Sequence, residues 1–181
     1  MTADKKNYFK IALIFVLCLL ARLIPFRAPN IEPILAATMP FSKTSGAFVA
    51  STFAVLSILL YDVLTGTLGL QTFFTVLAYG IIGLWSASYF KKKEAKALNY
   101  ARFAIMATLF FDAFTGLTVG PIFFHQSFLG SLIGQIPFTA FHLVGNVAFA
   151  IILSPAIYHF MIKKKEKEKL PIISILNPKI I

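Results

Sequence analysis

The chain has 181 residues, of which 58% are hydrophobic and only 13% are charged, about half of the ~25% that is usual in soluble domains. This composition excludes a soluble globular domain and a disordered chain, and it predicts the lipid bilayer as the solvent. The net charge of +10 does not indicate a nucleic-acid partner, because the lysines flank the apolar runs, as they do in membrane proteins.

Six helical segments are predicted within one integral membrane domain, residues 1–181. In chain order they cover residues 8–25, 31–42, 46–64, 70–90, 100–117 and 133–162, and a basic cytoplasmic tail follows at residues 163–181. We expect an all-α bundle of six transmembrane helices, because backbone groups in lipid must be satisfied within each segment. The second segment contains Pro33 and Pro40 and is too short to cross as a straight helix, so it is expected to tilt or break inside the protein.

The lysines predict the orientation. With six crossings and a cytoplasmic N-terminus, all 14 Lys residues fall on the inner face, including Lys43 and the cluster at residues 91–96. The short second segment must count as a crossing, since without it that cluster would face the opposite side from the N-terminus. The unusual polar residues are then predicted at or near the outer face: Arg22, Arg27, Asn30, Glu32, Asp62, Asp112, His125 and Gln126.

An aromatic-Asp-x-x-Thr-Gly pattern occurs twice, at residues 61–66 and 111–116. Both copies are predicted at outer helix ends, where Gly ends the helix and Thr satisfies backbone groups. A relic of duplication is the alternative. A cap needs no carboxylate, so Asp62 and Asp112 are candidate functional residues.

The last segment carries the strongest candidate site. Four polar residues spaced i, i+4, i+7 and i+11 lie on one narrow helix face, and His142 among them is expected ~13 Å below the outer rim. Such a stripe faces either a cavity or another helix, and its groups then bind a ligand or simply hydrogen-bond their neighbours. We predict a ligand pocket, to which the fourth segment adds Tyr79 from a weaker stripe with Thr72 and Thr75. The predicted ligand-binding residues are Arg22, Asp62, Tyr79, Asp112, Gln135, Thr139, His142 and Asn146.

The stretch at residues 119–132 is predicted to be a loop. It contains Phe123, Phe124 and His125, and Gly120 and Gly130 could serve as flexible ends. A loop this rich in aromatic residues is expected either to close over the pocket as a lid or to anchor the protein at the membrane interface.

Enzyme motifs such as HExxH, GxSxG and the P-loop are absent from the sequence, so we predict a protein that is not an enzyme and has no cofactor. Asp62 and Asp112 could join His125 or His142 around a metal ion, but nothing in the sequence fixes their spacing, and no metal site is predicted. A pocket without a nucleotide site equilibrates its ligand, couples it to an ion, or uses ATP hydrolysis by a partner.

Nearly the whole chain resembles the substrate-binding (S) components of energy-coupling factor transporters. The resemblance rests on the six-helix layout with both termini inside, on the short proline-containing second helix, and on two segments. The first is Asp-x-x-Thr-Gly-Thr-Leu-Gly at residues 62–69, and the second is Ile-Pro-Phe-Thr-Ala-Phe-His-Leu-Val-Gly-Asn at residues 136–146.

This resemblance implies a multi-pass protein of the prokaryotic plasma membrane that captures one vitamin-like small molecule in a pocket open to the outside. It also implies lids formed by the loops after the first and fifth helices. A transmembrane coupling protein and two cytoplasmic ATPases are the implied partners, and toppling of the S component would deliver the ligand inward. The candidate residues suit a polar heteroaromatic vitamin or nucleobase-like ligand.

Two other functions stay open at the level of sequence. A structural scaffold protein would use the polar stripe to bind a partner helix and would hold no small molecule. A solitary ion-coupled carrier would use Asp62 or Asp112 as a proton site. The predicted position of both aspartates near the outer rim, away from mid-depth, disfavours the carrier.

Overall fold

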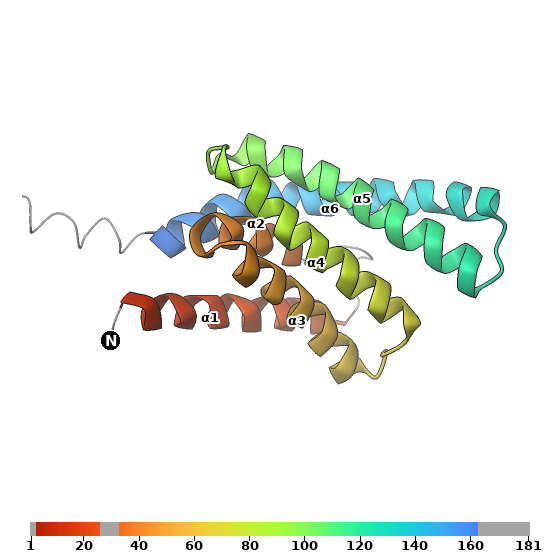
Figure 1. Cartoon of the computed structure of the whole chain (residues 1–181), viewed down its shortest axis with the longest axis horizontal. Coiled ribbons are helices and arrows are strands. Elements are labelled where there is room, and N and C mark those ends of the chain that lie inside the picture. The colour runs from red at the N-terminus through yellow and green to blue at the C-terminus, as the bar shows by residue number, and fades with distance from the viewer. Residues whose placement is uncertain (1–2, 26–32, 163–181) are drawn as a thin grey trace, which may run out of the picture.

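The computed structural model describes residues 3–25 and 33–162. Three residues predicted at the outer face, Arg27, Asn30 and Glu32, and the basic tail at residues 163–181 lie outside the described residues. Six helices make up the fold in Figure 1: α1 (Ala3–Leu23), α2 (Ile34–Ser45), α3 (Ala47–Thr65), α4 (Leu70–Lys91), α5 (Ala97–Phe123) and α6 (Phe128–Ile162).

Four of these helices, α3 to α6, are long and apolar enough to cross a membrane. The chain is therefore an all-helical, multi-pass membrane protein, as the composition predicts. The other two helices differ from these four in physical character. Lys5, Lys6, Lys10 and Arg22 make α1 more polar, and the 12 residues of α2 extend over only roughly 18 Å.

The short helix α2 forms the centre of the bundle. Every residue from Ile34 to Ser42 is buried, so this helix is enclosed on all sides. Its apolar side chains join two cores: Phe41 packs in one with Phe53 of α3, and Met39 lies in the other with Phe103 of α5. The interior Pro40 is tolerated because neighbouring helices surround the backbone that it disturbs.

The helices α3 and α4 approach each other closely at small residues. Ala50 and Ala54 of α3 are fully buried, and Ser51 donates a hydrogen bond of 3.0 Å to the backbone oxygen of Gly80. A methyl group added at Gly83 would lie 2.5 Å from the Cα atom of Ser51. Backbone contact this close needs a residue without a side chain, as is common between helices in membranes.

The lysines of the described residues gather at one end of the bundle, as predicted. The Lys10 ammonium donates hydrogen bonds to the backbone oxygens of Phe160 and Met161, at 2.8 and 3.0 Å, in the last turn of α6. Lys43 donates to the backbone oxygens of Phe90 and Lys93, at 2.7 and 2.8 Å. These carbonyls lack partners within their own helices, so the lysines cap the helix ends. Figure 1 shows the start of α1, the α4–α5 junction and the end of α6 on the same side.

We expect Lys43→Met to lower stability by about 1 kcal/mol, because two carbonyls at the end of α4 lose a charged donor while the apolar stem is kept. Lys91→Met is the matched control, since Lys91 is exposed at the end of the same helix. Thermal unfolding of the detergent-purified protein measures both. Equal melting temperatures for the two variants would contradict a capping role for Lys43.

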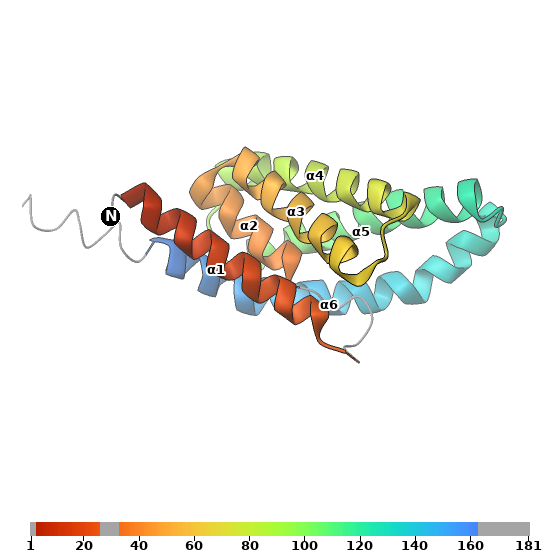
Figure 2. The same cartoon turned by 90° about the horizontal axis from the view of Figure 1, so that it is seen from below.

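The α5–α6 hairpin is longer than the sequence predicts. Most of the expected loop at residues 119–132 is helical, and only residues 124–127 connect the two helices. The helices measure roughly 40 Å and 52 Å, which exceeds the ~30 Å hydrocarbon thickness, and their shared tip extends beyond the α3–α4 hairpin (Figure 1). Helix α6 contains Pro137 and Pro155 and is curved (Figure 2).

Candidate functional site

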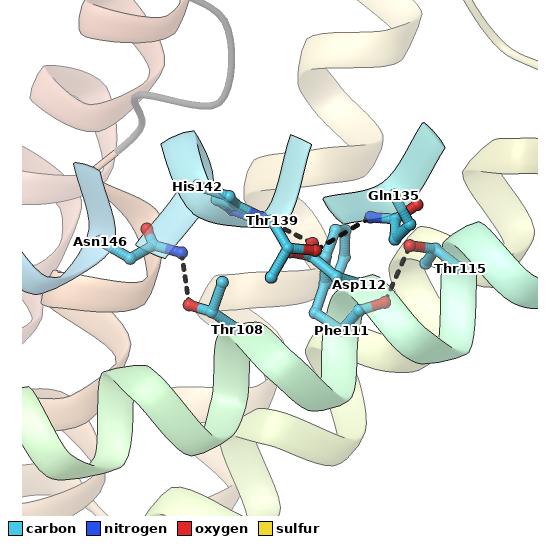
Figure 3. Close-up of polar contacts among 8 residues, drawn as sticks. All are labelled: Thr108, Phe111, Asp112, Thr115, Gln135, Thr139, His142 and Asn146. Atoms are coloured by element: carbon cyan, nitrogen blue, oxygen red, sulfur yellow. Dashed lines mark hydrogen bonds and ion pairs between the residues drawn. The ribbon is translucent and has the colours of Figure 1, made fainter. Parts of the chain in front are cut away.

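A buried ion-pair geometry links the last two helices. The Nδ1 atom of His142 on α6 lies 2.7 Å from Oδ1 of Asp112 on α5, with side-chain exposures of 4% and 2%. Because a carboxylate oxygen only accepts hydrogen bonds, the imidazole N–H donates. Both residues were predicted as ligand-binding, and the structure brings them together across the α5–α6 seam (Figure 3).

A second buried contact lies one helical turn further along the seam. The amide nitrogen of Asn146 donates a hydrogen bond of 2.9 Å to the hydroxyl of Thr108. Thr108 precedes Asp112 by four residues on α5, just as His142 precedes Asn146 on α6. The Asn146–Thr108 and His142–Asp112 contacts therefore lie next to each other along the two helices. Sequence analysis missed Thr108; its i−4 spacing from Asp112 is the signal that would have found it.

Aromatic rings surround the imidazole of His142. The ring centres of Phe111 and Phe138 lie 5.6 and 5.8 Å from its centre, both nearly edge-on. Tyr79 of α4 packs on Phe111 with a centre distance of 5.1 Å. The predicted residue Tyr79 therefore contacts Phe111, which itself lies against the imidazole of His142. Phe111 was also missed, because an aromatic residue in an apolar run carries no distinguishing pattern.

The other two residues of the α6 stripe line a groove beside the pair. The amide nitrogen of Gln135 lies 3.3 Å from the hydroxyl of Thr139 and donates to it. Both residues, together with Asp112, line a groove of about 340 Å³ between α5 and α6. The rest of its lining is apolar: Leu109, Ala113, Leu117, Leu132, Ile136, Ala140 and Leu143.

Two oxygen atoms of this cluster have no hydrogen-bond donor among the described residues. They are Oδ2 of Asp112 and Oδ1 of Asn146, and both are buried from solvent. A buried acceptor without a donor costs about 1–3 kcal/mol, more when it is charged. Within the described part of the chain, these two acceptors of the seam are thus left without donors.

Asp62 and Arg22 form a separate layer nearer the outer end. The hydroxyl of Thr72 donates a hydrogen bond of 2.6 Å to Oδ2 of Asp62, which ties α3 to the start of α4. The guanidinium carbon of Arg22 lies 4.1 Å from the ring centre of Tyr61. Thr72 precedes Tyr79 by two helical turns, roughly 10 Å, so this layer is distinct from the Asp112–His142 pair.

The residues predicted as a lid occupy the tip of the hairpin. Phe123 ends α5 and packs on Phe74 of α4, with ring centres 5.4 Å apart. Phe124 is 64% exposed, and His125 has a left-handed backbone with φ of 53°. The tip is a short turn between two long helices. It is not the flexible loop with glycine ends that the sequence predicts. The described residues contain no group of three metal-ligating side chains that would serve as a metal site.

His142 lies farther from the start of its helix than the sequence predicts. Helix α6 begins at Phe128, so the imidazole lies roughly 21 Å from the start of the helix and not ~13 Å. The fold and the site together define an integral membrane bundle with a buried carboxylate–imidazole pair between its last two helices. Comparisons with protein-family models, curated proteins and solved structures found no match to this chain.

Proposed function

We propose that this protein is the substrate-capture subunit of an ATP-driven importer of a vitamin or vitamin precursor, an S component of an energy-coupling factor transporter. One observation carries the proposal: the buried cluster of Asp112, His142 and Asn146 presents two acceptor atoms for which residues 3–25 and 33–162 supply no donor. A purely structural seam gains nothing from such atoms, whereas a ligand that donates hydrogen bonds satisfies them.

The depth of the cluster supports access from the outside. Asp112 lies 15 residues from the start of α5, roughly 22 Å from the lysine-rich end of the bundle. We place that end in the cytoplasm, since lysines favour the inner face. The groove beside Asp112 extends toward the outer end as far as Leu117 and Leu132, so a ligand from the external medium reaches it without crossing the bilayer.

The proposal includes the topology and the partners. All six helices count as crossings, with both termini in the cytoplasm of a prokaryotic cell, and the short, enclosed helix α2 is included among them. The chain has no P-loop, so the energy for import comes from two cytoplasmic ATPases that act through a transmembrane coupling protein.

The decisive experiment is mass spectrometry of small molecules that co-purify with the protein from cells grown in rich medium. We expect a vitamin-like compound, and we expect His142→Ala and Asn146→Ala to lower its affinity at least about tenfold. Phe48→Ala is the control, because Phe48 is 81% exposed on α3 and remote from the seam. A protein that retains full affinity in both seam variants would refute the pocket, and one that binds no compound would favour a scaffold function.

A solitary proton-coupled carrier is the second candidate, because a buried carboxylate–imidazole pair is also suited to holding a proton. If the protein is such a carrier, ligand uptake is expected in cells that lack the ATPases, and a protonophore is expected to abolish that uptake. If the protein is an S component, ligand uptake is expected to depend on the ATPases.

A further inference from the structure

We infer that the lysine-rich end of the bundle holds one anionic phospholipid, with its phosphate in a polar pocket between α1, α2 and α6 and an acyl chain in an apolar groove between α1 and α3. This binding site goes beyond the proposed function and does not depend on it. Three observations carry the inference: the donors that line the pocket, the positive charge around it, and the groove that begins beside it.

The polar pocket presents hydrogen-bond donors. Its lining consists of Asn7, Lys43, Thr44, Tyr158, Met161 and Ile162. The ammonium of Lys43 has three N–H groups and uses two of them on backbone oxygens at the end of α4, so the third has no acceptor among the described residues. The amide of Asn7 and the hydroxyl of Tyr158 are further donors in the wall. Phosphate oxygens accept all of these hydrogen bonds.

The pocket is small. Its volume of about 140 Å³ is well below the ~300 Å³ lower end of small-molecule sites, so it suits a single headgroup phosphate and not a whole cofactor. Figure 2 shows the start of α1 beside the end of α6, which together with α2 supply the walls of the pocket.

The lysine-rich end carries a large excess of positive charge. Among the side chains that the structure describes there, Glu94 is the single acid, and it pairs with Lys96 at 2.5 Å. Lys10 lies one helical turn from Asn7 on α1 and donates to the backbone oxygen of Met161, so a second ammonium borders the pocket. Basic pockets between membrane helices are typical sites for anionic lipid headgroups. The described cations at this end are Lys10, Lys43, Lys91, Lys92, Lys93, Lys96 and Arg102.

The apolar groove continues from the pocket into the membrane. Asn7 of the pocket and Ile11 of the groove lie one turn apart on the same face of α1. The groove has a volume of about 340 Å³ and extends from Tyr8 to Phe15 along α1, roughly 10 Å, which is most of the ~15 Å hydrocarbon depth of one leaflet. The small side chain of Ala12 leaves this space open.

The two cavities together select the ligand. A free phosphate ion would match the donors of the pocket but would leave the groove empty. An apolar partner helix would fill the groove but would offer no negative charge to Lys43. An anionic phospholipid supplies both parts in one molecule, at the depth where its phosphate lies in a bilayer.

Native mass spectrometry tests the headgroup preference. The full-length protein in detergent is incubated with equal amounts of phosphatidylglycerol and phosphatidylcholine that have the same acyl chains. We expect one phosphatidylglycerol to be retained, at least about fivefold more than phosphatidylcholine. Lys43→Met is expected to lower this retention about fivefold, because one lysine beside the phosphate is lost. Lys91→Met is the control, since Lys91 is exposed and lies outside the pocket.

The variant Ala12→Phe tests the groove and leaves the lysines in place. Its ring fills the space of the acyl chain, so the retention of phosphatidylglycerol is expected to fall about fivefold or more. Leu20→Phe is the matched control, because Leu20 is 55% exposed on the same helix and lies outside the groove.

Equal retention of the two lipids would overturn the inference, because the protein would then bind boundary lipid without regard to charge. Equal losses in Lys43→Met and Lys91→Met would overturn it as well, and so would full retention in Ala12→Phe. Displacement of the lipid by inorganic phosphate at millimolar concentration would assign the pocket to a free anion. A protein dimer that Ala12→Phe dissociates would assign the groove to a second copy of the chain. Either result would also overturn the inference.

Discussion

The double variant Asp112→Leu with His142→Leu is expected to melt close to the wild type and to bind no ligand. Each single variant is expected to be less stable than the double variant. His142→Leu leaves a buried carboxylate without its donor, at a cost of about 3–5 kcal/mol, whereas Asp112→Leu leaves an imidazole that need not carry charge, at about 1–3 kcal/mol. Removing both groups leaves neither a buried charge nor an imidazole without its partner, while the contact between Asn146 and Thr108 remains.

Thermal unfolding and ligand dialysis of the four proteins measure this double-mutant cycle. The exposed pair Glu94 and Lys96 is the matched control, with side-chain exposures of 71% and 72%, and its cycle is expected to show no measurable coupling. A double variant as unstable as His142→Leu would mean that the pair is an indispensable structural contact. A double variant that keeps its ligand would remove the pair from the binding site.

Gly83→Ala is expected to cause the second large effect, a loss of about 3 kcal/mol or more. The new methyl group would lie 2.5 Å from Cα and 2.7 Å from the backbone nitrogen of Ser51, and backbone atoms have no rotamer by which to move aside. The helices α3 and α4 must therefore separate, which disturbs the packing around the central helix α2. The melting temperature of the purified protein should fall by several degrees.

Gly134→Ala on α6 is the control for that substitution, because nothing lies within 4 Å of the added methyl group. It should leave the melting temperature unchanged or raise it slightly, since alanine favours helix more than glycine. If Gly83→Ala melts like the control, the close approach of α3 and α4 is not a determinant of stability.

The repeated aromatic-Asp-x-x-Thr-Gly pattern shows how far sequence reasoning reaches. In the first copy, Gly66 ends α3 in a left-handed conformation with φ of 69°, so the predicted cap is correct. In the second copy, Gly116 lies inside α5, and the helix continues to Phe123. A methyl group at Gly116 would lie 1.9 Å from the side-chain oxygen of Gln135, so this glycine admits a side chain of α6 and ends no helix.

The same comparison explains why the two aspartates differ. Asp62 lies in the last turn of α3, so its carboxylate reaches Thr72 in the first turn of α4. Asp112 lies inside α5, which continues for eleven more residues to Phe123, so its carboxylate stays in the seam with α6 and is buried. The same local pattern led to the same prediction at both sites, and the neighbouring helix decided their different outcomes.

The error in the predicted bounds of the loop at residues 119–132 has a related cause. Glycine, proline and serine between residues 119 and 132 indicate a loop in water. In this hairpin α5 and α6 pack against each other along their lengths, and Pro121 is accommodated within α5. Helix pairing thus overrode the local signals, which shortened the connection to residues 124–127.

The sequence by itself determined the membrane class, the all-helical fold, the gathering of lysines at one end and the four-residue polar face of α6. These properties depend on composition and on helical periodicity, which are local. Only the tertiary structure decided that α2 is the buried centre, that Asp112 pairs with His142 while Asp62 does not, and that two acceptor atoms of the α5–α6 seam have no donor among the described residues. Such contacts join helices that are far apart in the chain, and their geometry follows from side-chain packing that no local pattern encodes.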